Sequence, residues 1–130
     1  MSSWTRNALD RIDAAQELTL SSARGDGKLR RPVTMWVVRD GEDVYVRSVN
    51  GRGSAWFRGA LTRHEAHIRA GGVEANVRLV ETDDAGDRID AAYEAKYGRR
   101  YPTIVPSILA PLARAATLKL VPREATTTET

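Results

Sequence analysis

Residues 66–80 read AHIRAGGVEANVRLV, and this stretch decides the fold. Apolar and polar residues alternate on both sides of Gly71-Gly72, which is the pattern of two antiparallel strands joined by a two-residue turn. The polar face of this hairpin carries six side chains: Glu65, His67, Arg69, Glu74, Asn76 and Arg78. The stretch predicts a half-buried antiparallel sheet, with His67 and also His64 on or beside its solvated face.

Four further segments are typical of strands in the same sheet. Leucines alternate with hydroxyl residues over 18–21, and an apolar run covers 33–38. Alternation returns over 44–49, after the turn Asp40-Gly41, and over 116–120. Six strands that each bury one face favour a closed sheet. We therefore expect a mainly β protein, a six-stranded antiparallel split β-barrel with flanking helices.

Helical spacing appears in three other segments. It predicts an amphipathic helix over 3–15, a short helix over 56–61 capped by Ser54, and a longer helix over 84–97 that ends before Gly98. Prolines in RRYPTIVPSILAPL, residues 99–112, predict a loop packed over the barrel.

Length and composition limit the classes of protein. The 130 residues suit one core, so we expect a single domain over 1–123 and a disordered polar tail over 124–130. The sequence has no cysteine and two histidines, which excludes disulfides and argues against a metal site. It has no apolar run long enough to cross a bilayer and no signal-peptide pattern, so we expect a cytoplasmic protein without membrane contact.

Two loops carry residues suited to an anion. The predicted hairpin loop over 24–31 places four cations among glycines: Arg24, Lys28, Arg30 and Arg31. The segment 47–54 ends a strand in a turn and opens a helix at its positive end, which offers Ser48, Asn50, Gly51 and Arg52. Together the loops predict a phosphate site. A solvated charge cluster that aids solubility is the alternative for the first loop.

Aromatic residues form a third group. Trp36 lies in an apolar strand and Trp56 opens the short helix, while Tyr93, Tyr97 and Tyr101 surround the end of the longer helix. Such rings can stack on a flat cofactor or close over a substrate, with core packing as the alternative for each tryptophan. No nucleophile and base stand at a known spacing, so the sequence does not support a hydrolase.

These residues resemble a known pattern. The stretch from SSARGDGKLRRPVTMWVVRDGEDVYVRSVNG to AWFRGAL is similar to the core of the deazaflavin-dependent nitroreductases and of the wider pyridoxamine-phosphate-oxidase-like, FMN-binding split barrels. Over nearly the whole chain, WVVRDG, YVRSVNG, IRAGGVE, DAAYEAKYG and ARAATLKLVPR resemble domain-of-unknown-function family 2255. One departure is Asp26, a carboxylate placed where the nitroreductase hairpin has a basic residue.

The resemblance implies an oxidoreductase that transfers hydride from the deazaflavin coenzyme F-420 or from FMN to a small organic substrate. The cofactor-binding residues it implies are Arg24, Lys28, Arg30, Arg31, Ser48, Asn50, Gly51, Arg52 and Trp56. Trp36 and Tyr101 would line the substrate side, and Tyr93 and Tyr97 would donate a proton or hydrogen bond to the substrate. The resemblance also implies a homodimer that completes the cofactor site.

Two alternatives stay open at this stage. A barrel without a cofactor could bind a small ligand and act as an isomerase or cyclase through the shape of its cavity. Nucleic-acid binding is suggested by the pI of about 9.6 and the many arginines. The net charge of +3 is modest, however, and acidic residues are interspersed with basic ones, so nucleic acid is the least favoured partner.

Overall fold

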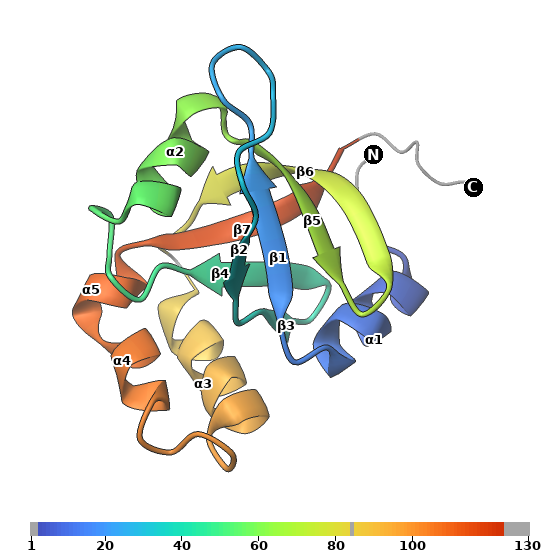
Figure 1. The fold of residues 1–130 in the computed structure, drawn as a ribbon. Coiled ribbons are helices and arrows are strands. Elements are labelled where there is room, and N and C mark those ends of the chain that lie inside the picture. The colour runs from blue at the N-terminus through green and yellow to red at the C-terminus, as the bar shows by residue number, and fades with distance from the viewer. Residues whose placement is uncertain (1–2, 84, 124–130) are drawn as a thin grey trace.

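The computed structural model describes residues 3–83 and 85–123, and the predicted tail lies outside them. Seven strands form one antiparallel sheet in the order β2-β1-β5-β6-β7-β4-β3 (Figure 1). The strands are β1 (Leu18–Ser22), β2 (Val33–Met35), β3 (Val38–Asp40), β4 (Asp43–Arg47), β5 (Glu65–Ala70), β6 (Val73–Glu81) and β7 (Thr117–Pro122).

The predicted split barrel is confirmed, but the count of six strands is wrong by one. The apolar run over 33–38 is divided between β2 and β3, and β3 continues to Asp40. These two strands stand at opposite ends of the sheet order, yet only Trp36 and Val37 separate them in the chain. The sheet must therefore curl until its two edges meet at this point, which makes the short crossing between β2 and β3 the closure of the barrel.

The β5–β6 hairpin forms as predicted. Ala70 pairs with Val73, and both turn residues have positive φ, 57° at Gly71 and 84° at Gly72. The backbone oxygen of Arg11 in the first helix also lies where a side chain at Gly71 would stand. Glycine is required there both for its backbone conformation and for the close approach of the helix.

Five helices lie among the described residues: α1 (Arg6–Ala14), α2 (Ala55–Arg63), α3 (Gly86–Tyr97), α4 (Val105–Leu109) and α5 (Pro111–Arg114). Ser54 caps α2 as predicted, by accepting a hydrogen bond from the N–H of Phe57. Helix α3 ends at Tyr97, before Gly98, as predicted, and Gly98 itself keeps right-handed helical angles. Over the described ranges no helix combines the length and the apolar character that crossing a bilayer requires.

The proline-rich segment 99–112 is not the predicted loop, because part of it folds into α4 and α5. Pro111 is the first residue of α5 and Pro106 the second of α4. A helix needs no backbone N–H at its first positions, so proline is compatible with both starts.

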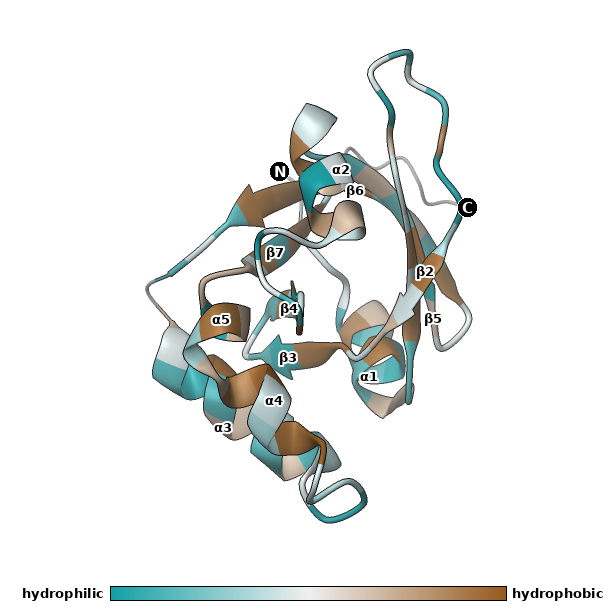
Figure 2. Ribbon diagram, turned by 60° about the vertical axis from the view of Figure 1, so that its left-hand side comes forward, coloured by the Kyte–Doolittle hydropathy of each residue, from teal (hydrophilic) through white to brown (hydrophobic). Residues whose placement is uncertain are grey.

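The apolar side chains form two cores. One fills the barrel, where strand residues such as Leu20, Val46 and Leu118 meet α1 and α2. The second lies outside the barrel, where α3, α4 and α5 cover one side of β3 and β4 (Figure 2). Strand β4 is accordingly buried on both faces, whereas β6 alternates between inward and exposed residues.

Candidate functional site

A groove of about 740 Å³ lies on the outer face of β1, β5 and β6, beside the long loop that projects between β1 and β2 (Figure 1). We call it the hairpin groove. Its lining residues are Glu17, Thr19, Ser21, Leu29, Pro32, His67, Arg69, Ala70, Gly71, Gly72, Val73 and Glu74. Its volume is in the range of small-molecule sites, which is about 300–1,000 Å³.

Strand register brings the polar side chains of the groove together. In β1 the leucines point into the barrel, so alternation leaves Thr19 and Ser21 on the outer face. Thr19 is opposite Arg69 of β5, and Ser21 is opposite His67. Glu74 of β6 is in turn opposite Arg69, so three neighbouring strands supply one polar floor. Leu29 and Pro32 of the hairpin loop add apolar side chains at its edge, whereas Ala70 and Val73 point toward the barrel core.

Glu74 interacts with both basic residues of the floor. One carboxylate oxygen lies 2.8 Å from Nε of Arg69, and the other lies 3.6 Å from Nε2 of His67. The second ring nitrogen, Nδ1 of His67, lies 2.9 Å from Oδ1 of Asn76. The sequence pattern predicted that these residues lie on a solvated face, and it indicated no functional role for them. The pairing of β1 with β5, which joins residues nearly fifty positions apart, creates the groove.

The basic hairpin loop is exposed, and its four cations differ in their partners. Arg24 forms an ion pair with Asp26 at 2.7 Å, and hydrogen bonding from Arg24 lowers the pKa of Asp26 to about 2. Arg30 donates to the carbonyls of Ala23 and Gly59, at 3.0 and 3.1 Å, and so fastens the loop to α2. Among the described residues Lys28 and Arg31 form no ion pair, and each adjoins a residue that lines the groove.

The turn over 48–54 is more closed than the hairpin loop. The hydroxyls of Ser48 and Ser54 are 2.8 Å apart, and the side chain of Leu112 covers the buried Gly51. Arg52 forms an ion pair with Glu81 at 2.7 Å and donates to the carbonyl of Ala115. Asn50 is exposed. The polar side chains of this turn therefore bond mainly to other residues of the protein.

Helix α2 separates the two predicted phosphate loops. The turn over 48–54 forms its N-terminus, whereas the hairpin loop contacts Gly59 in its middle and, through the carbonyl of Gly25, Arg63 at its end. Five residues of helix span about 8 Å. Lys28 and Arg31 are thus chain neighbours of the groove residues Leu29 and Pro32, whereas Arg52 pairs with Glu81 of β6 and donates to the carbonyl of Ala115 after α5.

The predicted catalytic tyrosines belong to the second core. Tyr93 is fully buried and Tyr97 is 1% exposed. The Tyr97 hydroxyl donates to the carbonyl of Gln16 at 2.9 Å and accepts from the N–H of Val37 at 3.1 Å, while burial raises its pKa to about 12. Burial also raises the pKa of Tyr93. Both side chains pack in the second core, and neither lines the hairpin groove.

The other predicted aromatics are partly buried. Trp36 stacks on Tyr97 with ring centroids 4.1 Å apart, and Tyr101 lies 5.3 Å from Trp36. Trp56 packs edge-on against Phe57 in α2. These contacts are those expected from core packing, which was the alternative role for Trp36 and Trp56.

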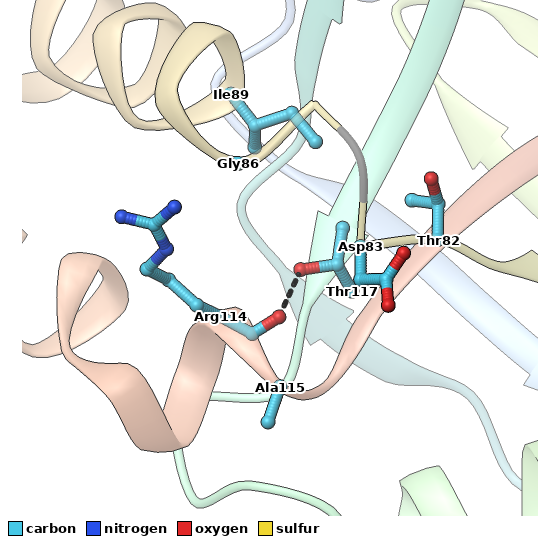
Figure 3. A pocket seen from close by; sticks show the side chains of 7 residues that line it. All are labelled: Thr82, Asp83, Gly86, Ile89, Arg114, Ala115 and Thr117. Atoms are coloured by element: carbon cyan, nitrogen blue, oxygen red, sulfur yellow. Dashed lines mark hydrogen bonds between the residues drawn. The ribbon is translucent and has the colours of Figure 1, made fainter.

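A smaller cavity of about 220 Å³ lies where α3 begins (Figure 3). Arg114 points toward it from α5, and the hydroxyl of Thr117 donates to the carbonyl of Arg114 at 2.8 Å. Arg114 also forms an ion pair with Asp90 at 3.0 Å. Asp90 in turn lies 2.6 Å from Arg47, whose side chain is fully buried at the end of β4. Sequence analysis missed this network, which joins α3 and α5 to the sheet.

Comparison with known proteins places the chain in a family. The profile described as uncharacterised protein conserved in bacteria, DUF2255, matches residues 8–120. The chain belongs to the DUF2255 family. No curated protein matches its sequence.

Solved structures resemble this DUF2255 protein in fold. A conserved hypothetical protein from Mycobacterium tuberculosis has a TM-score of 0.67 at 13% identity, over 95% of this chain and 83% of the other. A protein from Listeria innocua, named as a pyridoxamine 5'-phosphate oxidase candidate, has a TM-score of 0.62 at 19% identity, over 91% of this chain and 92% of the other. An F-420-H2 dependent reductase has a TM-score of 0.55 at 15% identity, over 82% of this chain and 93% of the other.

Further structural matches differ in what their names say they bind. They include a FAD-binding protein from Mesorhizobium loti and HutZ, the heme storage protein from Vibrio cholerae. The resemblance to split barrels is thus confirmed. At these identities the likeness concerns the fold, so the argument for function must come from the residues of the groove.

Proposed function

We propose that this DUF2255 protein binds a flavin or deazaflavin in the hairpin groove and transfers hydride between that cofactor and a small organic substrate. The observation that carries the proposal is the groove itself, whose polar floor lies beside Leu29 and Pro32. Their chain neighbours Lys28 and Arg31 form no ion pair within residues 3–83 and 85–123. Likeness to an F-420-H2 dependent reductase and to a FAD-binding protein supports the choice of cofactor class.

The residues of the groove fit such a group. A cofactor of this class has a flat ring and a tail that carries phosphate. Leu29 and Pro32 offer apolar contacts to a ring, and Thr19 and Ser21 offer hydroxyl hydrogen bonds. Thr34 of β2 is opposite Thr19 and extends this surface by one strand.

Lys28 and Arg31 would hold the phosphate, because charge-assisted hydrogen bonds to phosphate are worth about 1.5–3 kcal/mol each. When bound, the cofactor supplies the hydride chemistry. The chain would position the cofactor and the substrate relative to each other. A barrel without cofactor is the competing assignment, and the spectrum of the purified protein distinguishes the two.

The test is titration of the purified chain with FMN, FAD and F-420, monitored by absorbance and fluorescence. Hemin is titrated in parallel because of the likeness to HutZ. Replacing Lys28 and Arg31 together by alanine should weaken flavin or deazaflavin binding at least about tenfold, equivalent to about 1.4 kcal/mol.

A matched control removes the same charge elsewhere. Arg6 and Arg99 are exposed residues of α1 and of the turn after α3, and replacing both by alanine should leave affinity unchanged. Equal losses in the two double variants would indicate a nonspecific charge effect. Binding of hemin alone, or of none of these compounds, would overturn the proposal. Light scattering on the same samples measures whether the predicted homodimer forms.

A further inference from the structure

We infer that His67 is the proton donor and acceptor of the hairpin groove. This inference rests on the proposed function, because it assigns to one residue of that groove the proton that accompanies hydride transfer. The carrying observation is the position of the imidazole, between an amide on one side and a carboxylate on the other, on the floor of the groove.

Asn76 fixes which ring nitrogen can exchange a proton. Nδ1 of His67 lies 2.9 Å from Oδ1 of Asn76. An amide oxygen only accepts hydrogen bonds, so Nδ1 must carry its hydrogen. Nε2 is then the nitrogen left to exchange a proton with a bound molecule, and it is the one that lies beside Glu74. The two residues are direct partners in the β5–β6 register, which holds the ring in this orientation.

Glu74 places a negative charge beside Nε2, at 3.6 Å. Its second oxygen is held by Arg69, so the carboxylate is positioned from both sides. The remaining groups around His67 are Glu65 on its own strand, the uncharged Ser21 opposite it on β1, and Glu17 at the groove lining. The side chain of His67 is 27% exposed, so solvent can return a proton after each transfer.

A bound, reduced cofactor would supply a hydride, with its electron pair, to one atom of a polarised double bond in the substrate. The N–H bond at Nε2 of His67 breaks, and its proton forms a new bond to the other atom of that double bond. The substrate gains two electrons and two hydrogens, the cofactor is oxidised, and the neutral imidazole is reprotonated from water.

Chemical modification tests whether His67 faces a bound cofactor. Diethyl pyrocarbonate modifies accessible imidazoles, and peptide mass spectrometry distinguishes His67 from the exposed His64 at the end of α2. With FMN or F-420 at ten times its dissociation constant, modification of His67 should slow about tenfold, because only the free fraction reacts. His64 should react at its original rate. Binding without protection of His67 would overturn the inference.

Substitution tests the proton transfer itself. His67→Gln keeps a polar side chain opposite Asn76 but cannot exchange a proton. Reoxidation of the bound, reduced cofactor by menadione, measured with the cofactor saturating, should slow about 100-fold or more. His64→Asn is the control, since asparagine tolerates the left-handed backbone that His64 adopts with φ of 57°.

The outcomes separate the two proposals. If the cofactor binds but His67→Gln reoxidises at the parental rate, the proposed function stands and the role of His67 is refuted. If neither FMN nor F-420 binds, the proposed function fails and the role of His67 fails with it.

Discussion

The two outer faces of the barrel differ in what covers them. Helices α3, α4 and α5 cover the face formed by β3 and β4, and the aromatic residues that were candidates for the substrate side lie beneath or at the edge of that cover. In the part of the chain that the structure describes, no helix covers the face formed by β1, β5 and β6, and the hairpin groove lies there. The covered face supports the fold, whereas the open face carries the proposed site.

The pattern of buried and exposed residues along the strands also differs between the two faces. Strand β4 has four consecutive buried residues, Val44 to Arg47, because packing occurs on both of its faces. Strands β5 and β6 alternate because only one of their faces is packed. A polar residue therefore has different consequences on the two sides. Arg47 must find partners in the interior, whereas the side chain of His67 stays 27% exposed.

The largest effect should come from breaking the buried ion pair of the covered face. Asp90→Ala leaves the buried Arg47 without a carboxylate, and we expect a loss of about 3 kcal/mol in the free energy of unfolding. Urea unfolding at neutral pH measures it. Asp87→Ala is the matched control, since Asp87 also pairs with Arg114 but its side chain is 97% exposed; its cost should stay below about 1 kcal/mol. Equal costs would contradict the difference in burial.

The second prediction compares two tyrosines of the covered face. Tyr97→Phe removes a hydroxyl bonded to the backbone of Gln16 and Val37, so stability should fall by about 1–2 kcal/mol. Among the described residues the buried Tyr93 hydroxyl makes no hydrogen bond. Tyr93→Phe should therefore leave stability unchanged or raise it slightly. Thermal unfolding of both variants checks the order, and the reverse order would refute it.

The third prediction concerns pH. Burial lowers the pKa of Lys96 from 10.5 to about 8 in the folded protein, where its Nζ donates to the carbonyl of Val37 at 2.8 Å. Between pH 8 and 10 the unfolded chain holds this proton more tightly, so stability should rise with pH. Because the amine is partly exposed, the rise should stay well below about 1.4 kcal/mol per pH unit.

Above pH 10 the raised pKa of Tyr97 acts in the opposite direction, because the folded state then holds its proton more tightly. Urea midpoints measured from pH 7 to 11 should therefore pass through a maximum. Lys96→Met should abolish the rise, whereas Lys28→Met, on the exposed loop, should retain it. A rise that survives in Lys96→Met would assign it to another group.

The smallest effect is expected on the open face. Asp26→Asn removes the negative charge of the hairpin loop and keeps an oxygen that can accept from the N–H of Lys28. Affinity for FMN or F-420 should rise about twofold to threefold, since a unit charge several ångströms away in water contributes about 0.5 kcal/mol. Glu94→Gln on α3 removes the same charge far along the chain and should not change affinity. Higher affinity in both variants would indicate that the net charge of the protein, and not the position of Asp26, causes the gain.

Local patterns predicted much of this fold. The glycine pair of the β5–β6 hairpin, the Ser54 cap and the alternation of β1 follow from neighbouring residues, and the structure contains all three. The helices α4 and α5 were not predicted, because prolines that end helices can also begin them. The basic loop was a candidate from its charge, but which of its cations stay unpaired depends on Asp26 and on α2.

By itself, then, the sequence determined the antiparallel barrel, the positions of its turns and the presence of a cationic loop, since these depend on residues close together in the chain. Tertiary structure decided which outer face the C-terminal helices cover, and so buried Tyr93 and Tyr97 and left His67 open. It also decided that β1 lies beside β5, which assembles the groove from distant segments. The physical reason is that the alternation within a strand shows which of its side chains face inward. Which element packs on its outer face, and which strand lies beside it, depends on residues far away in the chain.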